Sequence, residues 1–393
     1  MARYFGGETS YALIRHPSLS GRTGPSYTGA ETVNKFQGGQ GQLALTFGQI
    51  STVLGFDFLS YDFSQEQAKT TTSPLTLGQS QYQNLGFFFL GKIRPLSKED
   101  LVISLGLRQD SYQVNVDNFK GQLGATPQTR TTSQRDFNRL LPSVGIAWSP
   151  LEELKIRLNY ATAYKVPTPR QLAGNYYMGS TLFLGDLSIK PEESRNWDLG
   201  LDLNLPSLSA SFSYFHTDYK NLISFRRISN SPAVSQYLNV DEAIIDGLEF
   251  KAAWDLSGVT DYKYSITPYL NLTHLLRFRS RDGLILPDVA KNSLGIGISL
   301  ANPKWGLKLT IDGSYLGAIN VAGSYTNQTP STRTGGVMIW DMAAIKEIYD
   351  FGNPGSLKLK LTVKNAFNRY YDTSDGDYMP GRAFFLSLIW EKD

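Results

Sequence analysis

Residues 197–205 read WDLGLDLNL, and this stretch decides the fold class. Every second position is large and apolar: Trp197, Leu199, Leu201, Leu203 and Leu205. The positions between them are small or polar: Asp198, Gly200, Asp202 and Asn204. Because successive side chains of a strand point to opposite faces, this alternation predicts a strand with one apolar and one polar face.

The same alternation recurs in four further segments: 155–164, 248–255, 293–300 and 357–364. Many such runs are about nine residues or longer, which is the length a tilted strand needs to cross a bilayer. A soluble β-sandwich with one wet face is the alternative, but its strands are usually shorter. We therefore predict an all-β protein, an antiparallel transmembrane β-barrel with about 16 strands, the first around Thr9–His16.

The connections between these segments alternate in length. Short turns are predicted near 48–50, 95–100, 150–153, 205–208, 257–261, 302–304 and 351–356. Long polar connections are predicted near 64–82, 118–136, 166–190, 226–236, 278–290, 318–335 and 372–380. Short turns on one side and long loops on the other are typical of an outer-membrane barrel.

Composition narrows the function classes. With 38 Lys and Arg against 35 Asp and Glu, the net charge of +3 makes nucleic acid an unlikely partner. There is no cysteine, hence no disulfide or thiolate site. No apolar run is long enough for a transmembrane helix. Residues 1–7 lack the apolar stretch of a signal peptide, so we expect that they are not the N-terminal export signal of the protein.

Charged residues identify the face that lines the lumen. The polar faces assigned by alternation carry five basic residues: Lys155, Arg157, Lys251, Lys358 and Lys360. A lysine or arginine that faces lipid at mid-membrane costs about 2–4 kcal/mol. A register slip of one residue would turn each of them outward, so the charge pattern constrains the register.

Five segments, in order along the chain, carry recognisable motifs. Residues 107–110 (LRQD) are similar to "L-R-x-D", and 160–168 (YATAYKVPT) to "Y-x-x-x-F/Y-K/R-x-P-T". Residues 186–200 resemble "N-P-x-L-K-P-E-x-S-x-x-x-E-x-G", and 239–249 resemble "N-x-x-x-A-x-x-x-G-x-E". Residues 363–382 resemble the closing "V-x-N-L-F-x-x-x-Y…P-G-R". Together these segments resemble TonB-dependent outer-membrane receptors.

The resemblance implies a fold, a location and a function. Members are 22-stranded barrels with a plugged lumen, and they import scarce metal chelates with energy from TonB. We therefore expect residues 1–393 to form a single barrel domain, the C-terminal part of such a receptor, without the plug and the first strands. The expected location is a Gram-negative outer membrane, and the expected cargo is a ferric siderophore, with haem or cobalamin as alternatives.

The expected partners follow from the same resemblance. They are outer-membrane lipid, lipopolysaccharide, a small metal chelate, and the TonB system only if missing sequence supplies a plug. No resident cofactor is expected. A free-standing diffusion porin with 16 strands is the alternative function, because that strand number is typical of porins.

Several motif residues have a structural interpretation. Pro167 and Pro191 have no N–H to donate, so they end strand pairing on either side of a long loop. Gly247 permits a bulge or a close backbone approach. Asn365, Asn368 and Arg369 are interpreted as ties between the last long loop and a strand end. For all of these we favour a structural role over ligand contact.

Catalytic signatures are weak, and an enzyme is not expected. The three histidines are His16, His216 and His274, and none has a metal-binding spacing. His216 and Asp218 share a face of one strand, which fits a hydrogen-bonded pair at a strand end better than a catalytic pair. A barrel protease or lipase would need a nucleophile or an acid pair at the rim.

Recognition has better candidates. Arg277, Arg279 and Arg281 keep the parity of Asn271 and Thr273, the wetter face, so they are predicted to line the extracellular mouth. Fixed cations there would attract an anionic ligand such as a ferric siderophore. Loop solvation and pairing with lipopolysaccharide phosphates are the alternatives.

A second group of candidates lies in other long loops. Arg226 and Arg227 form a basic pair, and Tyr176, Tyr177 and Phe183 would grip a flat or macrocyclic ligand by stacking. For these aromatic residues, a loop-packing cluster or an interfacial aromatic belt is the alternative.

Overall fold

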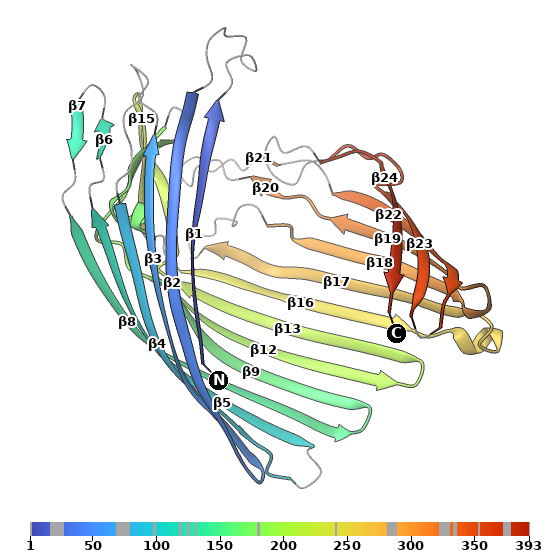
Figure 1. The fold of residues 1–393 in the computed structure, drawn as a ribbon. Coiled ribbons are helices and arrows are strands. Elements are labelled where there is room, and N and C mark those ends of the chain that lie inside the picture. Colours follow the sequence, from blue (N-terminus) through green and yellow to red (C-terminus); the bar gives the residue numbers. More distant parts are fainter. Residues whose placement is uncertain are drawn as a thin grey trace.

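The computed structural model describes residues 2–15, 27–67, 79–96, 100–117, 120–123, 126–129, 132–178, 181–239, 242–280, 289–321, 331–332, 336–352, 354–371 and 379–392. Sixteen strands form one antiparallel sheet, which curves from β1 to β24 (Figure 1). In order they are β1 (Ala2–Arg15), β2 (Tyr27–Phe47), β3 (Ile50–Gln67), β4 (Gln79–Ile93), β5 (Leu101–Asp117), β8 (Ser133–Leu151), β9 (Leu154–Lys165), β12 (Glu192–Leu205), β13 (Leu208–Lys220), β16 (Ala243–Trp254), β17 (Ser265–Ser280), β18 (Asn292–Asn302), β19 (Leu307–Leu316), β22 (Val337–Asp350), β23 (Ser356–Lys364) and β24 (Ala383–Glu391). The predicted all-β fold and its 16 strands are confirmed, although the first strand starts earlier than expected, at Ala2.

The connections follow the predicted alternation of short turns and long loops. β2 and β3 are separated by two residues, 48–49, and β12 and β13 by 206–207. By contrast, β9 and β12 are separated by 166–191, and β13 and β16 by 221–242. Within the part of the chain that the structure describes, no helix is both long and apolar enough to cross a membrane.

Strand register separates an apolar face from a polar face. Leu43, Leu54, Phe89 and Leu107 are direct neighbours across β2, β3, β4 and β5, and all four are exposed on one face. The opposite face carries ion pairs, such as Arg157 to Asp202. We assign the apolar face to lipid and the polar face to the lumen, as the charge pattern predicts.

On the lumen-facing side, one arginine joins three neighbouring strands. Arg108 of β5 donates to Asp110 on its own strand (Nε–Oδ2 2.8 Å) and to Asp57 on β3 (Nη1–Oδ2 2.7 Å). β4 lies between β3 and β5, and Gly86 is the β4 residue that lies opposite both aspartates. A Cβ on Gly86 would collide with the guanidinium group, so glycine is what lets Arg108 cross β4.

Pairing between β8 and β9 ends before either strand does. The ladder reaches Ser143 opposite Ala161 and then stops, although β9 continues beside β12. The next residue of β8 is Pro142, which has no N–H, and its carbonyl accepts a hydrogen bond from the Thr162 hydroxyl at 3.2 Å. The wall therefore opens toward the long-loop end, where a loop domain packs on the lumen-facing side.

Replacing Arg108 with Met is expected to lower the free energy of unfolding by about 1–3 kcal/mol, because Asp57 and the buried Asp110 lose their shared cation. Urea unfolding of the refolded chain in lipid vesicles would measure this. The control is Lys35→Met, which removes an exposed ion pair with Glu8 and should change stability by less than about 1 kcal/mol. Equal effects of the two variants would contradict the prediction.

Candidate functional site

Two long loops fold into one small domain at the long-loop end of the sheet. It contains a four-stranded sheet in the order β10 (Asn175–Met178), β11 (Thr181–Leu184), β15 (Ala233–Asn239) and β14 (Ile223–Asn230). The strands come from both connections, 166–191 and 221–242, and the strands β11 and β15 pair in parallel. We call the domain formed by 166–191 and 221–239 the loop domain; β15 marks it in Figure 1.

The loop domain packs against the lumen-facing side of the wall. From the wall, Val114 and Val116 of β5 and Phe137 of β8 are buried, with the same orientation as Arg108. The loop side of this core consists of four residues: Val166, Leu172, Ala173 and Ile189. Two of its residues, Val114 and Leu172, have no exposed surface. Burial of this apolar surface holds the domain inside the barrel wall.

A short helix begins the loop domain. α1 (Pro169–Ala173) starts with proline at its first turn, where the missing N–H costs no hydrogen bond. Thr168 caps it, since its hydroxyl accepts from the Gln171 amide and the Gln171 side chain accepts from the Thr168 amide at 2.8 Å. The capped helix directly follows β9 and begins the path of the chain into the loop domain.

Asn239 joins the two loops through three hydrogen bonds to backbone. Its Oδ1 accepts from the Lys190 amide at 2.7 Å, and its Nδ2 donates to the Lys190 carbonyl at 2.8 Å and to the Asn221 carbonyl at 2.7 Å. Both Lys190 and Asn239 lie in the motif segments of the sequence. Their roles were missed from sequence because the partners are backbone groups of distant loops.

Glu192 makes a second tie at the same place. Its carboxylate accepts from the Ile223 amide at 2.8 Å and from the Lys165 ammonium at 3.0 Å. Lys165 and Glu192 are also the last residue of β9 and the first of β12, paired directly. We call Glu192 and Asn239 the loop clamp. The predicted end of pairing beside Pro167 and Pro191 is thereby confirmed.

The other structural interpretations of the motif residues are also confirmed. Asn365 accepts from the Arg369 amide and donates to the Arg369 carbonyl, both at 2.8 Å, and Asn368 accepts from the Arg382 amide at 2.8 Å. Register shifts between Asp246 and Gly247, as expected for a bulge. These residues fix strand ends and loop bases.

The predicted face of Arg277 is wrong because of this bulge. β17 has one extra residue, Leu276, so Arg277 lies opposite Asp246 rather than in the row of Asn271 and Thr273. Arg277 donates from Nε to the Asp246 carboxylate at 2.8 Å. The Tyr214 hydroxyl, on the outward face, donates to the same carboxylate at 3.3 Å. Arg277 therefore lies outside the barrel wall.

The remaining arginines are less constrained. Arg279 is exposed and lies opposite Ile244, past the bulge, so it follows Arg277 to the outward face. Arg281 lies outside the described residues. Arg226 is exposed on β14, opposite Gln236, and belongs to the loop domain. Its neighbour Arg227 donates to the Thr181 hydroxyl at 3.3 Å. A ligand-binding role for any of them stays a prediction.

The structure constrains the aromatic candidates to different degrees. Phe183 is buried, and its ring lies edge-on to Phe225, with 5.1 Å between centroids, and 6.0 Å from Tyr237. These contacts favour the loop-packing interpretation over ligand stacking for Phe183. Tyr176 and Tyr177 form part of β10, and Tyr176 lies opposite Phe183 in the pair of strands.

His216 has structural partners. Its Nε2 lies 3.1 Å from the Asp218 carboxylate, as expected for a pair at a strand end, and its ring lies 5.4 Å from that of Trp197. Among the residues that the structure describes, no cluster of His, Asp and Glu is arranged to hold a metal ion.

The wall and its loop domain define a transmembrane β-barrel of the receptor class. A family model described as "TonB dependent receptor-like, beta-barrel" matches residues 2–366, and the chain belongs to this family. The motif-based resemblance is thus confirmed.

Individual relatives are distant. The heme/hemopexin utilization protein C of Haemophilus influenzae is 21% identical over 365 residues, which cover 82% of this chain and 46% of that protein. The chain therefore spans less than half the length of this curated relative.

Solved structures share the fold. The copper transporter OprC has a TM-score of 0.78 at 17% identity, over 98% of this chain and 62% of that one. The ferric enterobactin receptor of Pseudomonas aeruginosa, solved with enterobactin, has a TM-score of 0.70 at 18% identity, over 98% and 59%.

Replacing Asn239 with Asp is expected to loosen the loop domain and leave the wall intact. The carboxylate keeps the acceptor for Lys190 but loses both donors and faces two carbonyl oxygens, at a cost of about 1–3 kcal/mol. Hydrogen exchange of 181–184 and 233–238 should accelerate, while exchange in β2–β5 stays unchanged. The control is Asn204→Asp, which changes an asparagine at a short turn; equal acceleration in the loop domain there would contradict the role of the clamp.

Proposed function

We propose that this chain forms the wall and the ligand-receiving loops of an outer-membrane receptor for a metal chelate, with a ferric siderophore as the first candidate. The observation that carries the proposal is the loop domain, which is clamped to the lumen-facing wall where an external ligand would enter. Membership of the TonB-dependent family supports it. So do relatives whose names refer to ferric enterobactin, haem and copper.

Uptake driven by TonB is part of the proposal only under one condition. A gate that responds to TonB requires a plug, so uptake driven by TonB is proposed for the protein in which a plug accompanies this barrel. The chain itself would supply binding and the wall of the path.

The diffusion porin remains the second candidate, because 16 strands are typical of that class. It predicts an open pore and no saturable binding. The loop clamp favours the receptor, since residues at the base of the loops hold a folded domain rather than leave the mouth clear.

A panel of chelates separates the two functions. The refolded chain in lipid vesicles would be titrated with ferric enterobactin, haemin and cyanocobalamin, and its conductance would be recorded in planar bilayers. Saturable binding of one chelate at micromolar concentration or below is expected. Stable ohmic conductance with no binding of any chelate would contradict the receptor and favour the porin.

If the cargo is an anionic ferric chelate, Arg226→Gln should weaken its binding about three- to tenfold at low salt, because one exposed cation of the loop domain is lost. The difference should shrink in 0.5 M salt, where charges are screened. The triple variant R277Q, R279Q and R281Q tests the other arginines separately. An affinity and a salt dependence that neither variant changes would contradict recognition by these cations.

A further inference from the structure

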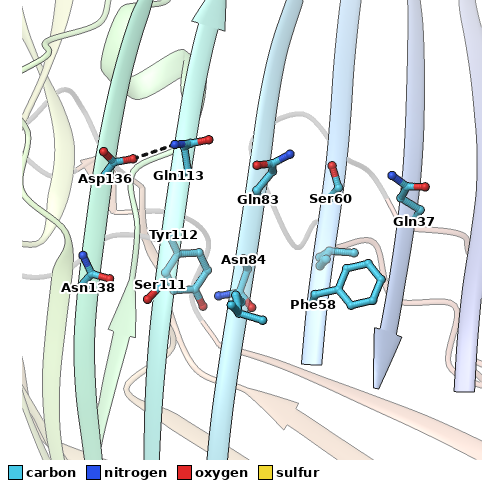
Figure 2. Close-up of a pocket in the computed structure, with 12 residues that line it drawn as sticks. Gln37, Phe58, Ser60, Gln83, Asn84, Ser111, Tyr112, Gln113, Asp136 and Asn138 are labelled. Atoms are coloured by element: carbon cyan, nitrogen blue, oxygen red, sulfur yellow. Dashed lines mark hydrogen bonds between the residues drawn. The ribbon is translucent and has the colours of Figure 1, made fainter. Parts of the chain in front are cut away.

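A row of polar side chains crosses five neighbouring strands on the outward face. Direct register places Gln37 of β2, Ser60 of β3, Gln83 of β4, Gln113 of β5 and Asp136 of β8 side by side. Figure 2 shows this row, in which Gln113 donates to Asp136 at 3.3 Å. The row shares its face with the apolar residues of the outward band, not with Arg108.

The row lies directly above the apolar band. One step toward the short turns, the outward residues are Phe58, Leu85, Ser111 and Asn138, and one further step gives Phe56 and Phe87. The change from apolar to polar side chains marks the edge of the bilayer on the long-loop side. In outer-membrane barrels that side faces the exterior.

These two rows line a shallow cavity of about 710 Å³. Its side chains are mainly amides and hydroxyls, and the Phe58 ring lines one side of it, below Ser60 (Figure 2). Among the described residues that line the cavity, Asp136 is the one charged residue, and none is a lysine or an arginine. Within the described part of the chain, Gln83, Ser111 and Asn138 have no side-chain partner, so their donors and acceptors face outward unpaired.

We propose that this cavity binds the sugars of the glycolipid in the outer leaflet. Neutral amides both donate and accept, which matches neighbouring sugar hydroxyls, and an aromatic face packs against the apolar face of a pyranose ring. Phosphate groups are poor candidates, because the cavity offers no cation to them. Because the cavity directly adjoins the apolar band, the headgroup of a neighbouring lipid lies at the height of the cavity.

The test uses the full refolded chain in detergent and three probes: rough lipopolysaccharide, its core oligosaccharide freed from lipid, and lipid A. The oligosaccharide should bind saturably and compete with lipopolysaccharide. Gln83→Ala and Asn138→Ala should each lower its affinity roughly three- to tenfold, since each removes up to two hydrogen bonds. The control is Asn271→Ala, which removes an exposed amide from the lumen-facing side and should change nothing.

Three outcomes would overturn the proposal. They are no binding of the oligosaccharide, unchanged affinity in both variants, and equal losses for lipid A, which would indicate an acyl-chain or phosphate site. Heat-dependent mobility on gels establishes that each variant is folded. As a second measurement, a photocrosslinking side chain in place of Ser111 should capture lipopolysaccharide in native outer membranes, and its failure to do so would also count against the proposal.

Discussion

Inside a bilayer, every backbone N–H and C=O group needs a hydrogen-bond partner within the protein, and this need determines the architecture of the chain. Sixteen strands in one antiparallel sheet meet this need for the strands between β1 and β24, each of which has a neighbour on either side. Among the described residues, the outer edges of β1 and β24 pair with no further strand. The ladder is interrupted between β8 and β9, where Pro142 removes a donor toward the long-loop end. Pro142 lies opposite Leu107, a residue of the apolar band, so the interruption begins at the height of that band. The two long loops fold into a domain beyond the ends of β9, β12, β13 and β16, where water can pair backbone groups that no strand pairs.

The same ladder allows a charged network to coexist with lipid. Because side chains alternate, Arg108, Asp57 and Asp110 all face the lumen while their neighbours in sequence face the membrane. Crossing β4 requires Gly86, so a residue without a side chain is part of the ion-pair network. The register is thereby fixed twice, once by the apolar band and once by charges that tolerate no slip of one residue.

The fold was predictable because alternation is a local property of the sequence. Strand number, the short turns and the long loops all follow from it, and the motif prolines and asparagines mark the strand ends. The predicted face of Arg277 was wrong, because the alternation of side chains was counted along β17 without a bulge. The extra residue Leu276 moves Arg277 to the outward face. A bulge is decided by the partner strand, where Gly247 and Asp246 lie, and no pattern within β17 reveals it. Likewise, Asn239 was not predicted as a clamp, since its partners are backbone groups of another loop.

The loop clamp also separates architecture from specificity. Asn239 and the Ile223 tie of Glu192 act through backbone amides and carbonyls, which every residue except proline supplies in full. Apart from the buried residues Val166, Leu172, Ala173 and Ile189, side chains elsewhere in the two loops can therefore change without disturbing the attachment of the domain to the wall. Proteins named for copper and for ferric enterobactin share this fold at 17% and 18% identity with the chain. In this chain, the clamp and the buried core thus fix the position of the loop domain and leave its exposed side chains free to change.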